Sequence, residues 1–118
     1  MPNPKRYWTT SSPTFIGSMA RLRVSAAARR DLERIGAIGA RDHGLAASAE
    51  YIEGFRRLFS LLRERPMAGQ ARLELGPGIR SLSHRPHRIL YRVEGDMVVV
   101  DRIIHQARDV RRALQDEP

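Results

Sequence analysis

The chain contains no cysteine, and this absence removes two classes of site at once. Neither a disulfide framework nor a thiolate metal centre can form, because both need cysteine sulfur. The 4 histidines are scattered and do not follow the spacing of a metal-binding motif. We therefore expect no metal and no cofactor. The absence of cysteine does not indicate whether the protein works in an oxidising or a reducing compartment.

Lysine is almost as scarce as cysteine, since Lys5 is the single lysine beside 20 arginines. With 21 basic and 13 acidic residues the net charge is +8. Such a charge favours an acidic partner, for example nucleic acid, an acidic peptide or the ribosome surface. An arginine bias this complete also follows from genomic base composition, and basic surfaces serve solubility. The charge therefore narrows the class of partner without naming one.

Long apolar runs are missing as well. Runs such as residues 97–100 are far shorter than a membrane span, and no basic stretch followed by an apolar one opens the chain as in a signal peptide. We expect a cytoplasmic protein that does not bind a membrane. Its 118 residues suffice for one domain with a modest core and are too few for two.

The first 18 residues are rich in proline, serine and threonine and have neither helical nor strand periodicity. We interpret residues 1–18 as a poorly ordered leader, which a mis-assigned start or a cloning remnant ending in Gly17-Ser18 would explain. Residues 19–118 are expected to form a single domain.

Two amphipathic helices are predicted after a short first strand. Residues 21–24 alternate polar and apolar as a half-buried strand does, and Ser25 is a good N-cap for the helix that follows. Apolar residues then recur every three or four positions up to Gly44, which suits the end of a helix. The second helix is predicted over residues 45–65, with Pro66 ending it. The glycine turn favours an antiparallel hairpin whose apolar stripes need a sheet to cover them.

Three further strands are expected in the second half of the chain. Residues 79–82 and 88–93 have strand character, and residues 97–104 form a β-branched run typical of a central strand. The residues 94–96 supply the turn of a β-hairpin. A short helix over residues 109–114 completes the order β-α-α-β-β-β-α.

Five short blocks between residues 21 and 114 resemble, in the same order, the signature blocks of ParE-like toxins of the RelE/ParE superfamily. Single blocks of this kind are common, but five in order within one small domain are specific. The blocks are Ser25–Ile35, Arg65–Gly69, Gly78–Ser81, Arg88–Val93 and Ile103–Asp109. The resemblance implies an α+β fold in which the N-terminal helical hairpin packs on one face of a small antiparallel sheet, with a short C-terminal helix.

The resemblance also implies a function and partners. ParE-like toxins of type II toxin-antitoxin systems act on DNA gyrase and stabilise its cleaved complex with DNA, and a cognate acidic ParD-like antitoxin neutralises them in a hetero-oligomer. Operator DNA is then expected to be bound through the antitoxin, with the toxin as a corepressor. RelE-like members of the same fold instead cut mRNA in the ribosome, which is the alternative function. A basic surface with an apolar groove independently suits an acidic amphipathic segment that folds as it docks.

Metal-independent cleavage of RNA by the neighbouring 2′-hydroxyl needs a base, an acid and cations for the developing charge. If the chain were such an interferase, the candidates would be Arg80, Arg88, Tyr91 and His105. Ribonucleases of the superfamily usually place a tyrosine, histidine or lysine near the C-terminus, and residues 111–118 contain none. We therefore expect no catalytic residue and favour a protein inhibitor of gyrase over an endoribonuclease.

Most of the remaining polar residues have structural interpretations. Tyr91 is interpreted as a core tyrosine and His105 as a residue that fixes the turn after the last strand. His84 and His87 are interpreted as loop residues, and the arginines of both helices as solvated faces. Candidates for bidentate contact with the antitoxin's acidic tail or with the target are Arg80, Arg88, Arg92, Arg108, Arg111 and Arg112.

Overall fold

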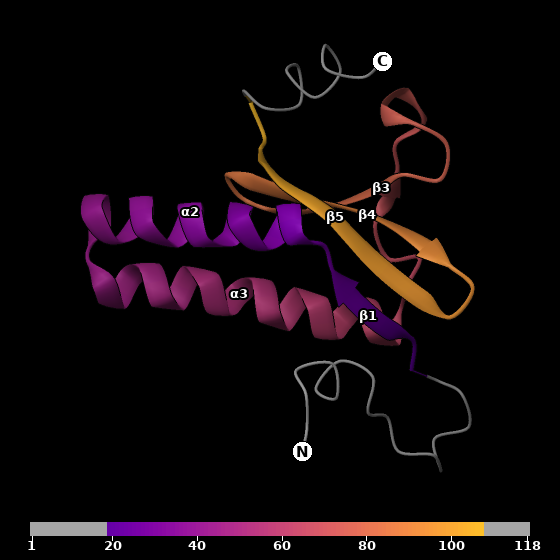
Figure 1. Cartoon of the computed structure of the whole chain (residues 1–118), viewed down its shortest axis with the longest axis horizontal. Coiled ribbons are helices and arrows are strands. Elements are labelled where there is room, and N and C mark those ends of the chain that lie inside the picture. Colours follow the sequence, from indigo (N-terminus) through magenta and orange to yellow (C-terminus); the bar gives the residue numbers. More distant parts are fainter. Residues whose placement is uncertain (1–18, 108–118) are drawn as a thin grey trace.

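The computed structural model describes residues 19–107 and shows two long helices beside a five-stranded sheet. The leader proposed for residues 1–18 and the helix predicted over residues 109–114 lie outside the described residues. The two helices lie antiparallel, and their joined ends project beyond the sheet (Figure 1). No helix within residues 19–107 is long and apolar enough to cross a membrane.

The helical hairpin forms where the sequence predicts it. Strand β1 (Arg21–Val24) leads directly into α2 (Ala26–His43), and the Ser25 hydroxyl accepts a hydrogen bond of 2.9 Å from the backbone N–H of Ala28. Gly44 ends α2 with φ at 97°, and its N–H donates to the Ala40 carbonyl at 3.0 Å. Helix α3 (Leu45–Glu64) follows without a linker. A positive φ at Gly44 reverses the chain here, because only glycine adopts it at little cost.

The strands β3, β4 and β5 form an antiparallel meander close to the predicted positions. They span Arg80–His84, His87–Glu94 and Met97–His105. Gly95, with φ at 63°, turns the hairpin between β4 and β5. A two-residue strand β2 (Gln70–Ala71) and a 3-10 helix η1 (Leu73–Leu75) were not predicted, since elements this short leave no periodic pattern. The sheet order is β1-β5-β4-β3-β2.

The first strand departs from the expected antiparallel sheet. Strand β1 pairs parallel to β5, with Arg21 beside Met97 and Val24 beside Val100, so the sheet is mixed. Alternation of polar and apolar residues indicates a strand but not its direction. A parallel pair needs a long crossover connection, and the helical hairpin together with the β3–β4 segment provides it.

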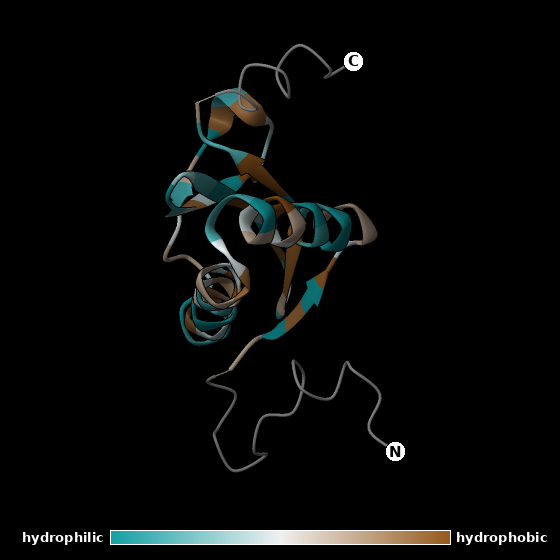
Figure 2. Cartoon of the chain, turned by 90° about the vertical axis from the view of Figure 1, so that its left-hand side faces the viewer, coloured by the Kyte–Doolittle hydropathy of each residue, from teal (hydrophilic) through white to brown (hydrophobic). Residues whose placement is uncertain are grey.

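A β-bulge in β5 determines which residues reach the core. Pairing with β4 passes from Leu90 beside Arg102 to Tyr91 beside Val100, so Asp101 is the extra residue. The bulge allows Val100 and Ile103 to face the same core. The core cluster beneath the helices comprises Leu22, Val24, Ala28, Phe55, Phe59, Leu62, Ile89, Tyr91, Val98, Val100 and Ile103. Figure 2 looks nearly along α3 and shows α2 obliquely, with hydrophilic residues along much of both helices.

Candidate functional site

A groove of about 780 Å³ lies between the projecting half of the helical hairpin and the sheet. We call it the hairpin groove. Its lining combines apolar side chains with a cationic rim and two aspartates. The apolar residues are Ile35, Ile38, Ala47, Pro86, Ile103 and Ile104, the cationic or titratable ones are Arg34, His43, Arg85, His87, Arg102 and His105, and Asp31, Gly39, Asp42, Ser48 and Tyr51 complete it.

One wall of the groove is built by Tyr51 and two histidines. The Tyr51 hydroxyl donates to the His84 carbonyl at 2.6 Å and lies 2.8 Å from Nδ1 of His87. The rings of Tyr51 and His84 are stacked, with centroids 4.2 Å apart, and His84 Nε2 is 2.9 Å from the Tyr51 carbonyl. Burial raises the pKa of Tyr51 to about 12, although the hydrogen bond with His87 opposes this shift. Tyr51 is therefore a neutral hydrogen-bonding group at ordinary pH.

The histidines of this wall lie in strands, and the interpretation of His84 and His87 as loop residues is wrong. His84 ends β3 and His87 begins β4, because the turn between these strands occupies only two residues. The His84 ring fits against α3 because residue 54 is glycine; a Cβ there would lie 2.5 Å from His84 Cε1. His105 ends β5, 5.5 Å from His87 between ring centroids, and its Nδ1 accepts from the Ala107 N–H at 3.3 Å. That contact fits the turn-fixing role.

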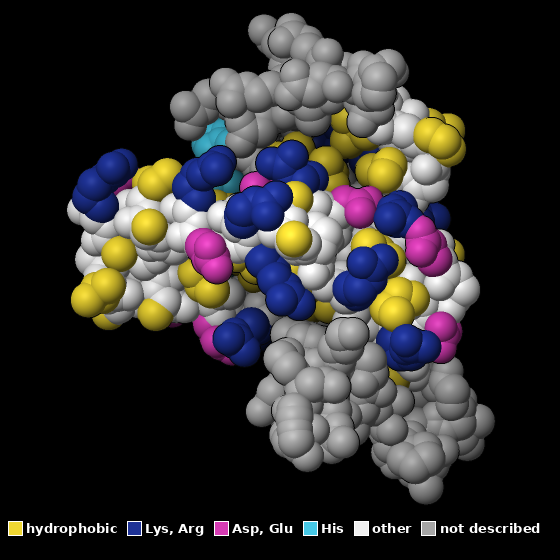
Figure 3. Space-filling model, in the orientation of Figure 1, with side chains coloured by type: hydrophobic (Ala, Val, Ile, Leu, Met, Phe, Trp, Pro, Cys, Tyr) yellow, Lys and Arg dark blue, Asp and Glu magenta, His cyan; other side chains and the backbone are white. Residues whose placement is uncertain are grey.

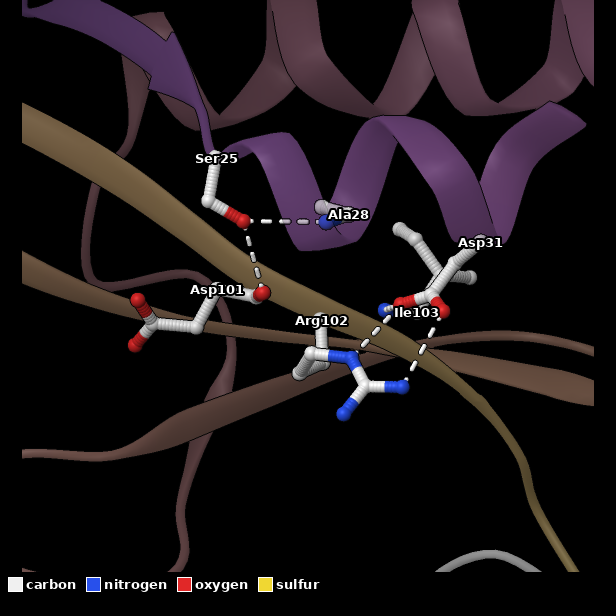
Figure 4. A network of polar contacts seen from close by, with 6 residues as sticks. All are labelled: Ser25, Ala28, Asp31, Asp101, Arg102 and Ile103. Carbon is white, nitrogen blue, oxygen red and sulfur yellow. Dashed lines mark hydrogen bonds and ion pairs between the residues drawn. The ribbon is translucent and has the colours of Figure 1, made fainter.

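Asp31 connects α2 to the bulge of β5 (Figure 4). Its buried carboxylate accepts from Arg102 Nε at 2.8 Å and Nη2 at 3.1 Å, and from the Ile103 backbone N–H at 2.9 Å. The Ser25 hydroxyl donates to the Asp101 carbonyl at 2.8 Å from the start of the same helix. This contact was not predicted from the sequence. Its available signal is that Asp31 lies three residues after the buried Ala28, on the inner stripe of the helix.

The structure does not bring the four interferase candidates together. Paired residues of neighbouring strands project from the same face of a sheet. Arg80 pairs with Tyr91, and His105 with His87, on the helix side. Arg88 alternates with the core residue Ile89 and projects from the opposite side, which we call the far face. An acid-base pair with cations around one scissile phosphate is therefore not assembled from this set.

The Tyr91 side chain belongs to the hydrophobic core. Its side chain is completely buried, and its hydroxyl donates to the Pro66 carbonyl at 2.7 Å and accepts from the Gly69 N–H at 2.7 Å. Burial raises the pKa of Tyr91, which the hydrogen bond with Gly69 and the charge of Arg80 oppose. Both hydrogen bonds hold the loop before β2 against the sheet. This geometry agrees with a core tyrosine.

The predicted arginine candidates differ in their surroundings. Arg80 Nη1 donates to the Gly69 carbonyl at 2.6 Å, and Arg92 Nε donates to Asp101 at 3.0 Å and also pairs with Glu94. Arg88 lies on the far face with Arg92. The candidates Arg108, Arg111 and Arg112 lie outside the described residues. Within residues 19–107, no group of three or more histidine, aspartate or glutamate side chains is placed to hold a metal ion.

A family model described as "ParE toxin of type II toxin-antitoxin system, parDE" matches residues 22–110. The chain belongs to the ParE toxin family. Toxin ParE1 of Mycobacterium tuberculosis is 32% identical over 96 residues, 80% of this chain and 98% of that toxin. Toxin ParE3 of Caulobacter vibrioides is 31% identical over 74 residues, 63% of this chain and 74% of that toxin. One chain of the solved structure described as "Chromosomal ParDE TA system from P. aeruginosa" has the same fold, with a TM-score of 0.66 and 22% identity. The match covers 75% of this chain and 97% of that one.

The ParE family membership confirms the resemblance inferred from the five sequence blocks. The matched range, residues 22–110, contains every residue that lines the hairpin groove as well as the Asp31 contact with β5. This ParE-family protein is therefore the toxin of a type II toxin-antitoxin system, and the groove belongs to the domain that it shares with its relatives.

Proposed function

We propose that this ParE-family toxin acts in the cytoplasm by inhibiting DNA gyrase and so blocks replication. The observation that carries the proposal is the division of the ribonuclease candidates between the two faces of the sheet. The Tyr91 hydroxyl, which an endoribonuclease would use as base or acid, is already engaged with Pro66 and Gly69. A protein inhibitor needs no such group, because its effect comes from binding.

A matched pair of assays tests this proposal. Purified full-length toxin is added to gyrase in a supercoiling and DNA-cleavage assay, and to ribosomes translating a defined mRNA. We expect lost supercoiling and accumulated cleaved DNA, with intact mRNA. Cleavage of mRNA at ribosomes without any effect on gyrase would establish the RelE-like alternative and refute the proposal.

We further propose that a cognate acidic ParD-like antitoxin neutralises the toxin by placing an amphipathic segment in the hairpin groove. The apolar side chains of Ile35 and Ile38 suit the apolar stripe of such a segment. The two aspartates of the lining are already paired, Asp31 with Arg102 and Asp42 with Arg41. The remaining charge of the rim is therefore positive and complements an acidic partner.

The groove proposal predicts an effect that depends on position. Ile38 is 43% exposed and lines the groove, whereas Leu45 is 80% exposed at the same end of the hairpin but does not line it. Ile38→Glu should weaken binding of the protein encoded next to the toxin at least tenfold, because the carboxylate must be buried against an acidic segment. Leu45→Glu should bind like the wild type. Isothermal titration measures both, and equal affinities for the two variants would contradict the proposed position.

A further inference from the structure

Four exposed arginines lie on β1 and on the first half of α2, outside the hairpin groove. They are Arg21, Arg23, Arg29 and Arg30, and we call them the basic face. We propose that the basic face binds the phosphate backbone of double-stranded DNA without reading base sequence. This goes beyond inhibition of gyrase and beyond antitoxin binding, and neither of those activities is needed to test it.

The fold presents these side chains to solvent for different reasons in the two elements. In β1, Leu22 and Val24 are buried in the core, so alternation turns Arg21 and Arg23 outward. In α2, the buried Ala28 faces inward and the two following arginines are exposed. Figure 3 shows basic side chains over α2 and β1 on one face of the molecule, with acidic side chains between some of them.

The two elements hold a fixed relation to each other. Ser25, the residue between them, donates its backbone N–H to the Val100 carbonyl at 3.0 Å and its hydroxyl to the Asp101 carbonyl at 2.8 Å. The Asp31 contact with β5 follows six residues after Ser25. The arginines of both elements therefore project from one rigid support, which lowers the entropy lost when they bind a common ligand.

The charge of the basic face is not neutralised within the described part of the chain. None of the four arginines forms an ion pair with a described carboxylate, although Glu33 lies on the same helix at three- and four-residue spacing. The first turn of α2 contains no acidic residue, so the positive end of the helix dipole adds to the potential. We therefore expect a partner of this face to carry several negative charges.

The composition of the face distinguishes duplex DNA from other polyanions. Single-stranded nucleic acids are bound by stacking bases on aromatic rings, and protein partners by aromatic or apolar anchors. The described aromatic rings, Tyr51, Phe55, Phe59 and Tyr91, lie in the core or at the groove wall. Within residues 19–107 the exposed large hydrophobic residues are Ile38, Leu45, Met67 and Leu73, and none belongs to β1 or to the first half of α2.

Duplex DNA presents a regular series of negative charges and needs neither aromatic nor apolar anchors on the protein. It carries one phosphate charge per about 1.7 Å of helix axis, and the planar guanidinium fork matches a phosphate in two hydrogen bonds. Contacts to phosphate carry no sequence information, and the face has no asparagine or glutamine beside its arginines, so we expect binding that does not depend on sequence. Sequence-specific reading of the operator stays with the antitoxin.

The test compares two variants of equal net charge. In the first, Arg21, Arg23, Arg29 and Arg30 are replaced by glutamine (R21Q, R23Q, R29Q, R30Q). In the control, four other exposed arginines are replaced in the same way (R41Q, R56Q, R57Q, R65Q). Fluorescence anisotropy measures binding of the full-length proteins to a labelled 24-base-pair duplex of arbitrary sequence between about 50 and 200 mM KCl, the range over which phosphate contacts show their salt dependence. Thermal melts confirm that all three proteins are folded.

Four phosphate contacts account for about a 150-fold loss of wild-type affinity across that fourfold change in salt, from a slope of about −0.9 per contact. We expect the basic-face variant to lose this salt dependence and at least tenfold in affinity at 50 mM KCl, and the control variant to retain both. Equal losses in the two variants would show that net charge alone is responsible and overturn the proposal. Absence of wild-type binding, or tighter binding to single-stranded DNA or to polyglutamate of equal charge, would also overturn it.

Discussion

Replacing Asp31 by alanine should be among the most destabilising single changes on α2. The substitution removes three hydrogen bonds, two from Arg102 and one from the backbone N–H of Ile103. Arg102 is half exposed, at 51%, so water can replace its lost partner. The Ile103 N–H is buried and has no such replacement. An unsatisfied buried donor costs about 1–3 kcal/mol.

The expected loss of stability is therefore about 3 kcal/mol, of which the lost ion pair contributes roughly 1 kcal/mol and the orphaned N–H most of the rest. For a domain of this size the melting temperature should fall by about 10 °C. Asp31→Asn should cost roughly half as much, because the amide oxygen can still accept from Ile103 N–H while its NH₂ group faces Arg102.

Asp42→Ala is the matched control. Asp42 lies on the same helix and also pairs with an arginine, but its side chain is 48% exposed and that of Arg41 is 73% exposed. Its removal should change the free energy of unfolding by less than about 0.5 kcal/mol. Urea denaturation followed by circular dichroism gives both values, with unchanged m indicating the same denatured state. If Asp31→Ala shifted the midpoint no more than Asp42→Ala, the buried contact with β5 would not be a major source of stability.

Three further changes test the sheet and the groove wall. The pKa of Tyr51 is raised from 10.0 to about 12, so the unfolded chain loses its proton first and stability should fall between pH 10 and 12. Tyr51→Phe should remove part of this loss of stability in alkaline urea titrations. The part removed is at most about 1.4 kcal/mol per pH unit, and less for a partly exposed ring. An unchanged dependence of stability on pH would exclude Tyr51 as the source of the loss. Tyr91→Phe leaves the Pro66 carbonyl and the Gly69 N–H unpaired, and should cost about 2–3 kcal/mol in urea denaturation, whereas a loss below about 0.5 kcal/mol would mean that water replaces the hydroxyl. Gly54→Ala should lower the melting temperature, because its Cβ would meet the His84 ring at 2.5 Å. Gly36→Ala should be neutral or stabilising, because the nearest atom to its Cβ is 3.7 Å away. Equal melting temperatures for the two variants would contradict the tight fit at Gly54.

Much of the fold follows from local patterns that the sequence displays directly. The N-cap at Ser25, the glycine at position 44 and the 3.6-residue periodicity define the helical hairpin, and all three rest on interactions between neighbouring residues. The β4–β5 hairpin follows in the same way from its alternating residues and from Gly95. The direction of β1 in the sheet could not be predicted from local patterns, because it depends on pairing with β5, which is distant in the sequence.

The candidate site was less predictable because it is built from distant residues. The pairing of Tyr51 with His84 spans 33 positions, and that of Asp31 with Arg102 spans 71. Neither partner has a local signal that names the other. The bulge at Asp101 adds to the difficulty, since it reverses the alternation of β5 and decides whether Ile103 faces the core or the far face. Family resemblance supplies the toxin assignment, but the contacts that shape the groove emerge only from the fold.

The two proposed surfaces depend on the same helix. The inner and lateral side of α2 contributes Ile35 and Ile38 to the hairpin groove, while Arg29 and Arg30 belong to its outer side. Asp31 lies between them and fixes the helix to β5. A variant at Asp31 should therefore weaken antitoxin binding and DNA binding together, whereas Ile38→Glu should affect only the first and R29Q with R30Q only the second. Because the two proposed surfaces lie on different sides of one helix, we expect an antitoxin segment in the groove to leave the basic face accessible, so that both ligands bind one toxin molecule at the same time.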